Sequence, residues 1–292
     1  MRKRSIFFGL ALAMIALLSG CGGGDGSSGS SGTISMNITD AKPVLPEEGV
    51  ESVTIKFDEV SVHKSGGRWT TLPVETSPLS SEIDLYWFQD GSTTQFVPPV
   101  GLECGKYTQV RIGVTSGIIR INGVNHNLEI PSTNLKTDKN FEFDVPCGGA
   151  VNITVDFDLS QSIELTGVGT YQLKPVLHIN ETSKAAAVQG KINFNTAATQ
   201  ATVVVYWDKN GNGTLEDPDP LDPNTDEEYT RILVQKTDPV PFKVFWLVPE
   251  KGYIVQVLLG DSQSPDRSYV EYVDPSKLGK GAVYDLNGGN PI

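Results

Sequence analysis

The stretch Val-Asn-Ile-Thr-Val-Asp-Phe, residues 151–157, alternates apolar and polar side chains at every position. Successive side chains of a β-strand point to opposite faces, so this alternation places all of its apolar side chains on one face. A helix would instead require apolar residues three and four positions apart. Residues 151–157 therefore predict a β-strand with one face packed against a hydrophobic core.

The same alternation recurs along the first half of the chain, and further runs that predict strands follow in the second half. The runs lie at 34–38, 53–57, 110–114, 119–121, 141–145, 188–194, 202–207, 242–248, 254–259, 269–273 and 283–286. Asn122-Gly123 predicts a two-residue hairpin turn, because both residues tolerate positive φ. A single helical turn is predicted at 159–162, capped by Asp158. The expected fold class is all-β, with two β-sandwich-like domains.

The boundary between the two domains is predicted from a small, polar stretch, residues 182–187. It separates two sets of predicted strands, each large enough for a small sandwich. We place the first domain at 33–182 and the second at 187–292.

The start of the chain has the features of an export signal. Met1-Arg2-Lys3-Arg4 precedes an apolar run from Ile6 to Leu18, and small residues lead into Cys21. This order is typical of a bacterial lipoprotein signal, and the run is shorter than the ~20 residues of a membrane span. We predict a signal peptide at 1–20 and lipid, palmitate included, on Cys21. The alternatives are an ordinary secretory signal and an uncleaved anchor.

Residues 22–32 contain only Gly, Ser and Asp, so residues 21–32 predict a lipidated cysteine followed by a flexible tether. Position two of the mature chain is Gly22 and not Asp. This favours the outer membrane in a cell that has two membranes. Whether the protein faces the periplasm or the cell surface stays open.

The net charge of the chain argues against some classes of binding partner. The chain has 35 acidic and 23 basic residues and a formal charge of −12. Nucleic acids require clustered Lys and Arg, so a chain this acidic is a poor candidate to bind them. The expected partners are the membrane, through the N-terminal lipid, and an envelope protein or glycan.

Cys104 and Cys147 form a pair once Cys21 is assigned to lipid. An exported chain meets an oxidising compartment, which favours a disulfide between them. A metal site would need nearby His or Cys residues, and none is close in the sequence. We predict a structural disulfide.

A loop in the second domain has the spacing of a calcium site. Calcium binds six to eight oxygen ligands, and a glycine at position 6 permits the sharp bend that such a loop needs. The candidate ligands are Asp208, Asn210, Asn212, Thr214 through its carbonyl, Glu216 and Asp219. Asp219 has a shorter side chain than the usual Glu, and a strand precedes the loop, which lowers the specificity of the match. We predict a weak, structural Ca²⁺ site, with a metal-free acidic loop as the alternative.

Several separated segments of the first domain match a known family in order. They are 38–41, 53–62 with Trp69, 105–111, 130–132, 155–162 and 171–176. Over residues 33–180 the chain resembles the bacterial lipoprotein family known as domain of unknown function 4382. The resemblance implies an exported β-rich domain and supplies no catalytic residues. Residues 188–192 resemble, more weakly, a carboxypeptidase-regulatory type of β-sandwich, which implies a spacer or binding module.

The remaining chemistry-bearing residues favour binding over catalysis. The sequence contains none of the common nucleophile, zinc-protease or phosphate-loop motifs. Asp156 and Asp158 could act as a pair of carboxylates, but a solvated or helix-capping role is favoured. The four tryptophans could form a sugar-binding surface, although at least two are expected in the cores. We therefore predict no enzyme but a membrane-anchored binding or scaffold protein. A carbohydrate-binding module is the alternative, and an envelope hydrolase is a less favoured third.

Overall fold

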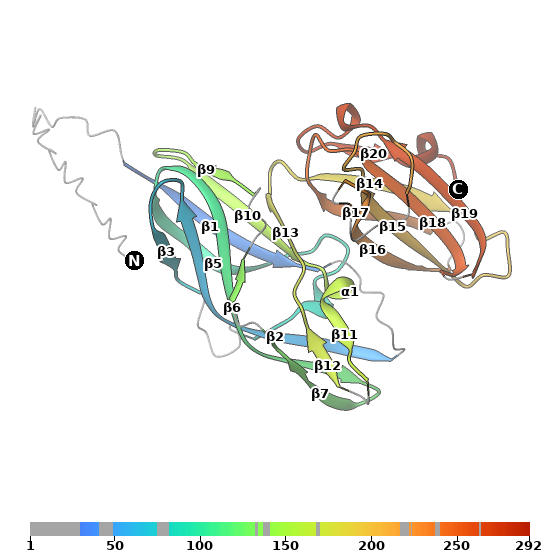
Figure 1. The fold of residues 1–292 in the computed structure, drawn as a ribbon, viewed down its shortest axis with the longest axis horizontal. Helices are drawn as coiled ribbons and strands as arrows, with labels where there is room; N and C mark the ends of the chain where they lie inside the picture. Colours follow the sequence, from blue (N-terminus) through green and yellow to red (C-terminus); the bar gives the residue numbers. More distant parts are fainter. Residues whose placement is uncertain are drawn as a thin grey trace, which may run out of the picture.

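A computed structural model describes residues 30–40, 49–74, 82–131, 134–136, 141–167, 170–216, 222, 224–236, 240–262 and 264–292. The predicted signal peptide and Cys21 lie outside these ranges, as does Asp219. No helix in the ranges is long and apolar enough to cross a membrane. The fold is all-β and sandwich-like, as the sequence predicts (Figure 1).

The buried apolar residues fall into two clusters, one made by residues 34–179 and one by residues 186–292. We call the parts of the chain that contain them the N-terminal unit and the C-terminal unit. In Figure 1 the N-terminal unit runs from blue to yellow-green and the C-terminal unit from yellow to red.

The described residues of the N-terminal unit form two sheets. The smaller has the strand order β13-β10-β1-β5, and the larger contains the path β11-β12-β7-β6-β2-β3, with β4 on β2 and β8 and β9 on β6. The elements are β1 (Ser31–Thr39), β2 (Val50–Lys64), β3 (Trp69–Leu72), β4 (Glu82–Asp84), η1 (Leu85–Trp87), β5 (Thr94–Glu103), β6 (Gly105–Ile121), β7 (Val124–Glu129), β8 (Asn134–Lys136), β9 (Phe143–Val145), β10 (Ala150–Phe157), α1 (Leu159–Ser162), β11 (Ile163–Leu165), β12 (Tyr171–Leu173) and β13 (Leu177–Glu181).

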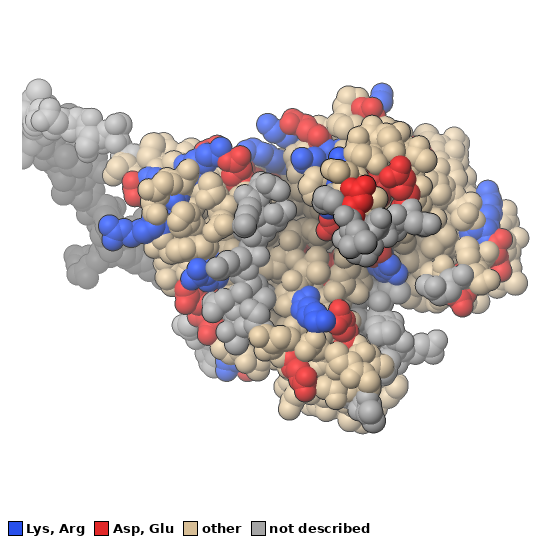
Figure 2. Space-filling model, in the orientation of Figure 1, with Lys and Arg blue, Asp and Glu red and all other residues tan. Residues whose placement is uncertain are grey.

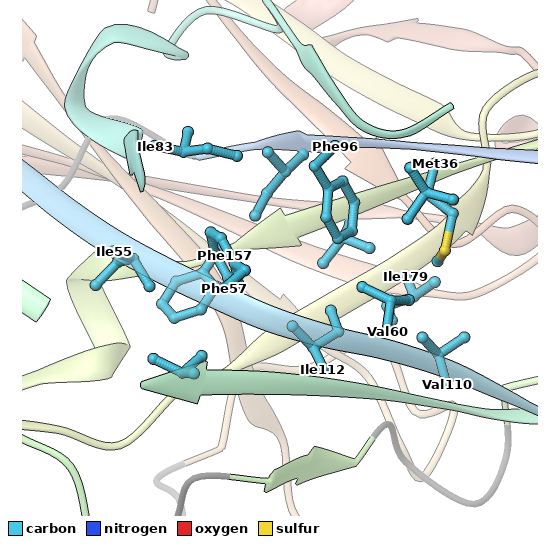
Figure 3. Packing of buried hydrophobic residues seen from close by; sticks show 14 of the residues in the cluster. Met36, Ile55, Phe57, Val60, Ile83, Phe96, Val110, Ile112, Phe157 and Ile179 are labelled. Carbon is cyan, nitrogen blue, oxygen red and sulfur yellow. The ribbon is translucent and has the colours of Figure 1, made fainter. Parts of the chain in front are cut away.

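The core of this unit lies between the two sheets, where the apolar faces of their strands meet (Figure 3). The ring of Phe57 in β2 lies 6.0 Å from that of Phe96 in β5 and 6.4 Å from that of Phe157 in β10, measured between centroids. All three side chains are buried. Tilted and edge-on aromatic pairs at such distances are favourable beyond the area they bury, so these rings join the sheets.

The strand that decided the sequence prediction, β10, is buried on both faces. Ile153, Val155 and Phe157 point into the core, as the alternation predicts. Thr154 and Asp156 on the opposite face are also buried, at 1% and 2% exposure. The outer face of this strand is therefore covered as well.

The hairpin turn and the helical turn are both confirmed. Asn122 and Gly123 have φ of 47° and 79° between β6 and β7, the values that a primed turn requires. Asp158 precedes α1, and its carboxylate accepts the backbone N–H of Gln161.

The tether predicted at 21–32 is two residues too long. β1 already includes Ser31 and Gly32, because the neighbouring loops bind this part of the chain. The Ser30 carbonyl accepts the N–H of Cys104, and the Ser31 carbonyl accepts the N–H of Gly148. A Cβ on Gly32 would lie 2.3 Å from the Pro146 carbonyl oxygen, so a side chain does not fit there.

The predicted disulfide between Cys104 and Cys147 is confirmed, with Cα atoms 5.0 Å apart. Cys104 follows β5 and Cys147 follows β9. The bond therefore joins the two loops that hold the start of β1.

The C-terminal unit packs a three-stranded sheet, β17-β14-β20, with a four-stranded sheet, β16-β15-β18-β19, in the described part of the chain. Its elements are β14 (Ala186–Ile192), β15 (Gln200–Trp207), β16 (Glu227–Gln235), β17 (Val240–Leu247), β18 (Tyr253–Asp261), β19 (Ser264–Val273), η2 (Pro275–Lys277), β20 (Val283–Asp285) and η3 (Leu286–Gly289). β16 is not predicted from the sequence, because its residues do not alternate.

Replacing both Cys104 and Cys147 by Ser should lower the free energy of unfolding by about 2–5 kcal/mol, because the loop that the bond closes gains entropy when the chain unfolds. Denaturant unfolding of the double variant and the wild type measures the difference. As a control, dithiothreitol should destabilise the wild type and leave the variant unchanged. Equal midpoints for the two proteins would contradict the structural role of the bond.

Candidate functional site

The two units meet through partly buried polar and aromatic contacts. The ring of His178 in β13 stacks on that of Tyr229 in β16, with centroids 3.9 Å apart. The Asn180 side chain donates to the Trp246 carbonyl at 2.6 Å, and the Gln161 side chain donates to the Tyr229 carbonyl at 2.8 Å. Backbone, amide and aromatic groups thus join α1 and β13 to β16 and β17.

Burial sets the ionisation of the stacked pair. Burial raises the pKa of Tyr229 well above its usual range, so its hydroxyl stays protonated and donates to the Trp246 carbonyl at 3.1 Å. Burial lowers the pKa of His178, against the opposing effects of Asp158, the Tyr229 backbone and Glu227. The imidazole is therefore neutral near pH 7.

A cavity of about 240 Å³ lies between the units. Asp40, Asp90, Gly91 and Asp156 line it from the N-terminal unit, and residues of β16 and β17 line it from the other side. The volume would hold several water molecules or one small polar ligand.

Two polar groups without a hydrogen-bond partner belong to residues of the C-terminal unit that line this cavity. They are the hydroxyl oxygen Oγ1 of Thr230 and the indole nitrogen Nε1 of Trp246, and both atoms are buried. A buried polar group without a partner costs about 1–3 kcal/mol. Such groups in the wall of a cavity are places where a bound molecule can replace the missing partner.

Trp246 is also held in an unusual backbone conformation. Its φ is +63°, the left-handed region that bulky residues rarely adopt. Its carbonyl oxygen is held in place by the donors from Asn180 and Tyr229. One donor from each unit therefore holds the carbonyl of a residue whose conformation costs about 1–3 kcal/mol.

Asp156 and Asp158 have separate roles. Asp158 is fully buried and caps α1, as predicted; its Oδ2 also accepts from the Gln161 side chain at 3.0 Å. The sequence predicts a solvated or helix-capping Asp156, but this residue is buried and lines the cavity with Asp40. Cross-strand pairing places Asp156 between Thr39 and His178, on the face that the C-terminal unit covers.

A second hollow of about 310 Å³ also crosses the interface, lined by His178, Glu181, Lys184, Trp207 and Lys251 among others. The ammonium groups of Lys209 and Lys251 lie 5.7 and 5.2 Å from the centre of the Trp207 ring. The Trp207 ring therefore already has cation–π contacts with two lysine side chains.

The expectation that at least two tryptophans lie in the cores is wrong. None of the four is buried: Trp87 is 75% exposed, and Trp69, Trp207 and Trp246 are half-buried. Trp69 contacts Arg111, whose guanidinium lies 4.2 Å from the ring centre.

The candidate calcium loop follows β15 and closes on itself. The Asp208 carboxylate accepts the backbone N–H groups of Gly211, Asn212 and Gly213. The side-chain amides of Asn210 and Asn212 donate to the Glu216 carboxylate, and Asn212 Oδ1 accepts the N–H of Thr214. Gly213, at position 6, has a φ of +69°, as the sharp bend requires.

Five of the six predicted calcium ligands thus share one loop, and Asp219 lies outside the described residues. Within those residues no group of three or more His, Cys, Asp or Glu side chains is placed ready to hold a metal ion. The calcium site stays a prediction.

Acidification should destabilise the protein through His178. Below about pH 6.5 the unfolded chain takes up a proton at this residue while the folded protein does not. The stability that this residue contributes is complete above that pH. It is lost, at up to about 1.4 kcal/mol per pH unit, as the pH falls towards the lowered folded-state pKa. Thermal melting of the wild type and His178→Phe between pH 8 and 5 measures the effect.

The His178→Phe variant keeps an aromatic ring on Tyr229 and should show the smaller loss. His126→Phe, in β7, removes an imidazole away from the interface and should behave as the wild type. Superimposable pH profiles for the wild type and His178→Phe would contradict the argument.

Solved structures offer only remote likenesses. A leucine-rich repeat protein from Bacteroides thetaiotaomicron is 11% identical with a TM-score of 0.19; the match covers 90% of this chain and 27% of that one. A candidate adhesin from Bacteroides ovatus is 10% identical, with a TM-score of 0.21 and coverage of 90% and 91%. The shaft pilin SpaA from Lactobacillus rhamnosus GG is 8% identical, with a TM-score of 0.21 and coverage of 88% and 96%. At these TM-scores, neither the fold nor the function of this protein is inferred from those structures.

No curated protein matches the sequence. Residues 31–175 match the family model described as Domain of unknown function (DUF4382), which confirms the resemblance predicted for the first domain. The match covers β1 to β12 and includes the cysteines of the disulfide. Over residues 31–175, the N-terminal unit of this chain is therefore similar to the DUF4382 family.

Proposed function

We propose that this protein is a non-catalytic, lipid-anchored protein of the bacterial envelope whose two units together form a binding module. The observation that carries the proposal is the cavity of about 240 Å³ between the units. Thr230 and Trp246 are among the residues that line it, and the hydroxyl of the first and the indole N–H of the second have no hydrogen-bond partner. Neither unit could form this cavity alone, since each supplies part of the lining.

The Cys21 anchor and the outer membrane remain parts of this proposal. The start of β1 at Ser31 leaves a short segment between Cys21 and the first strand. A lipid on Cys21 would therefore hold the N-terminal unit near the membrane surface.

The surface charge fits a partner other than nucleic acid. On the face shown in Figure 2, Lys and Arg are interspersed with Asp and Glu and form no continuous basic patch. Polyanion binding requires such a patch. The acidic net charge of −12 supports the same conclusion.

The anchor is tested by metabolic labelling. We expect radiolabelled palmitate to enter the wild type and not Cys21→Ser, because the thiol is the acceptor. The wild type should fractionate with membranes and the variant should be released. Labelling of neither protein, or unchanged fractionation of the variant, would remove the anchor from the proposal.

A carbohydrate is the ligand class favoured by the chemistry of the cavity. Sugar hydroxyls can donate to carboxylates such as Asp40 and Asp156 and accept from the Trp246 N–H. The apolar faces of Phe245 and Trp246 lie in the same lining and can contact sugar C–H groups. This is the second candidate function.

A glycan array probed with the full chain tests this candidate, and Thr230→Val is the matched variant. Valine preserves the shape of threonine and removes a hydroxyl that has no partner in the protein. We expect the variant to keep its stability and to bind the captured glycan at least tenfold more weakly. A blank array rejects the carbohydrate, and equal binding by the variant rejects the cavity as the site.

A further inference from the structure

An acidic residue outside the predicted calcium loop lies beside it. Asp226 immediately precedes β16 and is 1% exposed. Its Oδ2 accepts the backbone N–H of Glu216 at 2.9 Å. This contact brings the end of the loop and the start of β16 together.

The other carboxylate oxygen of Asp226, Oδ1, is buried and has no hydrogen-bond partner. A carboxylate oxygen is an acceptor only, so it requires a donor or a cation. Burial raises the pKa of Asp226, and the charges of Asp208 and Glu216 raise it further, against the Glu216 N–H. Asp208 and Glu216 are thus both near enough to Asp226 to disfavour its charge.

Tyr272 of β19 and Gly252, just before β18, lie close to the loop. A Cβ on Gly213 would lie 3.2 Å from the Tyr272 ring, and one on Gly252 would lie 3.4 Å from the Asp208 carboxylate. Asp208 itself is 5% exposed, and its N–H donates to the Gly252 carbonyl. The carboxylate at position 1 is therefore held in a fixed, largely dry position.

We propose that Asp226 completes a calcium site in this loop, with Asp208, Asn210, Asn212 and Glu216, in the place that the sequence pattern assigns to Asp219. Each carboxylate or amide oxygen has two lone pairs, so an oxygen that accepts one backbone N–H can still bind a cation. Glu216, which now accepts the two Asn amides at 2.9 and 2.8 Å, moves from them to the ion. With backbone carbonyls or water, these side chains supply the six to eight oxygens that calcium needs.

This arrangement favours calcium over magnesium. Calcium accepts irregular coordination at 2.3–2.6 Å, whereas magnesium demands a near-ideal octahedron at 2.0–2.1 Å. Two of the five side chains are neutral amides, and the loop must rearrange to close. We therefore expect a dissociation constant of about 10⁻⁴–10⁻³ M, the range of extracellular modules.

The test is calorimetric titration of calcium chloride into the full chain, purified in mild detergent and freed of metal with EGTA. Asp226→Asn keeps the shape and removes the charge, and it should weaken binding at least tenfold. Asp222→Asn is the matched control, since Asp222 is exposed and its carboxylate accepts from Asn224 in its own turn. Asp219→Asn tests the residue that the pattern assigns.

Loss of affinity in Asp226→Asn, with wild-type affinity in Asp222→Asn and Asp219→Asn, supports the site. Wild-type affinity in Asp226→Asn overturns it, as does the absence of calcium binding by the wild type at 10 mM. If Asp226→Asn does not fold, Glu216→Gln replaces it, and thermal melting gives a second measurement. Calcium should then raise the melting temperature of the wild type and not that of Glu216→Gln; equal shifts would reject the site. None of these results depends on the lipid or on the interface cavity.

Discussion

The structure depends on the burial of the smaller sheet of the N-terminal unit on both of its faces. Its inner face carries Phe96 and Phe157, which meet Phe57 of the larger sheet. Its outer face carries Asp156 and His178, and the C-terminal unit covers them. Polar groups on a covered face must find partners or be left unsatisfied. The capped helix, the aromatic stack and the polar cavity are all responses to that single constraint.

The helical turn α1 links the two units through one side chain. The Asp158 carboxylate holds the Gln161 amide, and the same amide donates to the Tyr229 carbonyl of β16. A residue that the sequence indicates as a local cap is thus also a positioning group for the interface. Asp226 lies three positions before Tyr229, so a cation bound there would restrain the strand that carries both the stack and the Thr230 hydroxyl.

The sequence predicts well those features that a few neighbouring residues determine. The alternation at 151–157, the Asn122-Gly123 turn and the Asp158 cap are local, and all three are present. β16 was missed because Tyr229 and Thr230 are adjacent and both buried, so its residues follow no period of two. β5 was missed because Pro98 and Pro99 argue against a strand; they are tolerated because β5 lies at the edge of its sheet. The cavity and the burial of Asp156 arise from contacts between distant parts of the chain, which no local pattern encodes.

The way the chain enters β1 has a mechanical consequence. β1 is a central strand, hydrogen-bonded to β10 on one side and β5 on the other. A pull applied to Ser30 along the axis of this strand would load its ladder bonds in shear, all together instead of one after another. The first hydrogen bonds under tension are those that the Ser30 and Ser31 carbonyls accept. Their donors are the N–H groups of Cys104, which is part of the disulfide, and of Gly148, which follows Cys147. Tension at this end of the protein therefore reaches the two loops that the disulfide joins before it reaches the aromatic core.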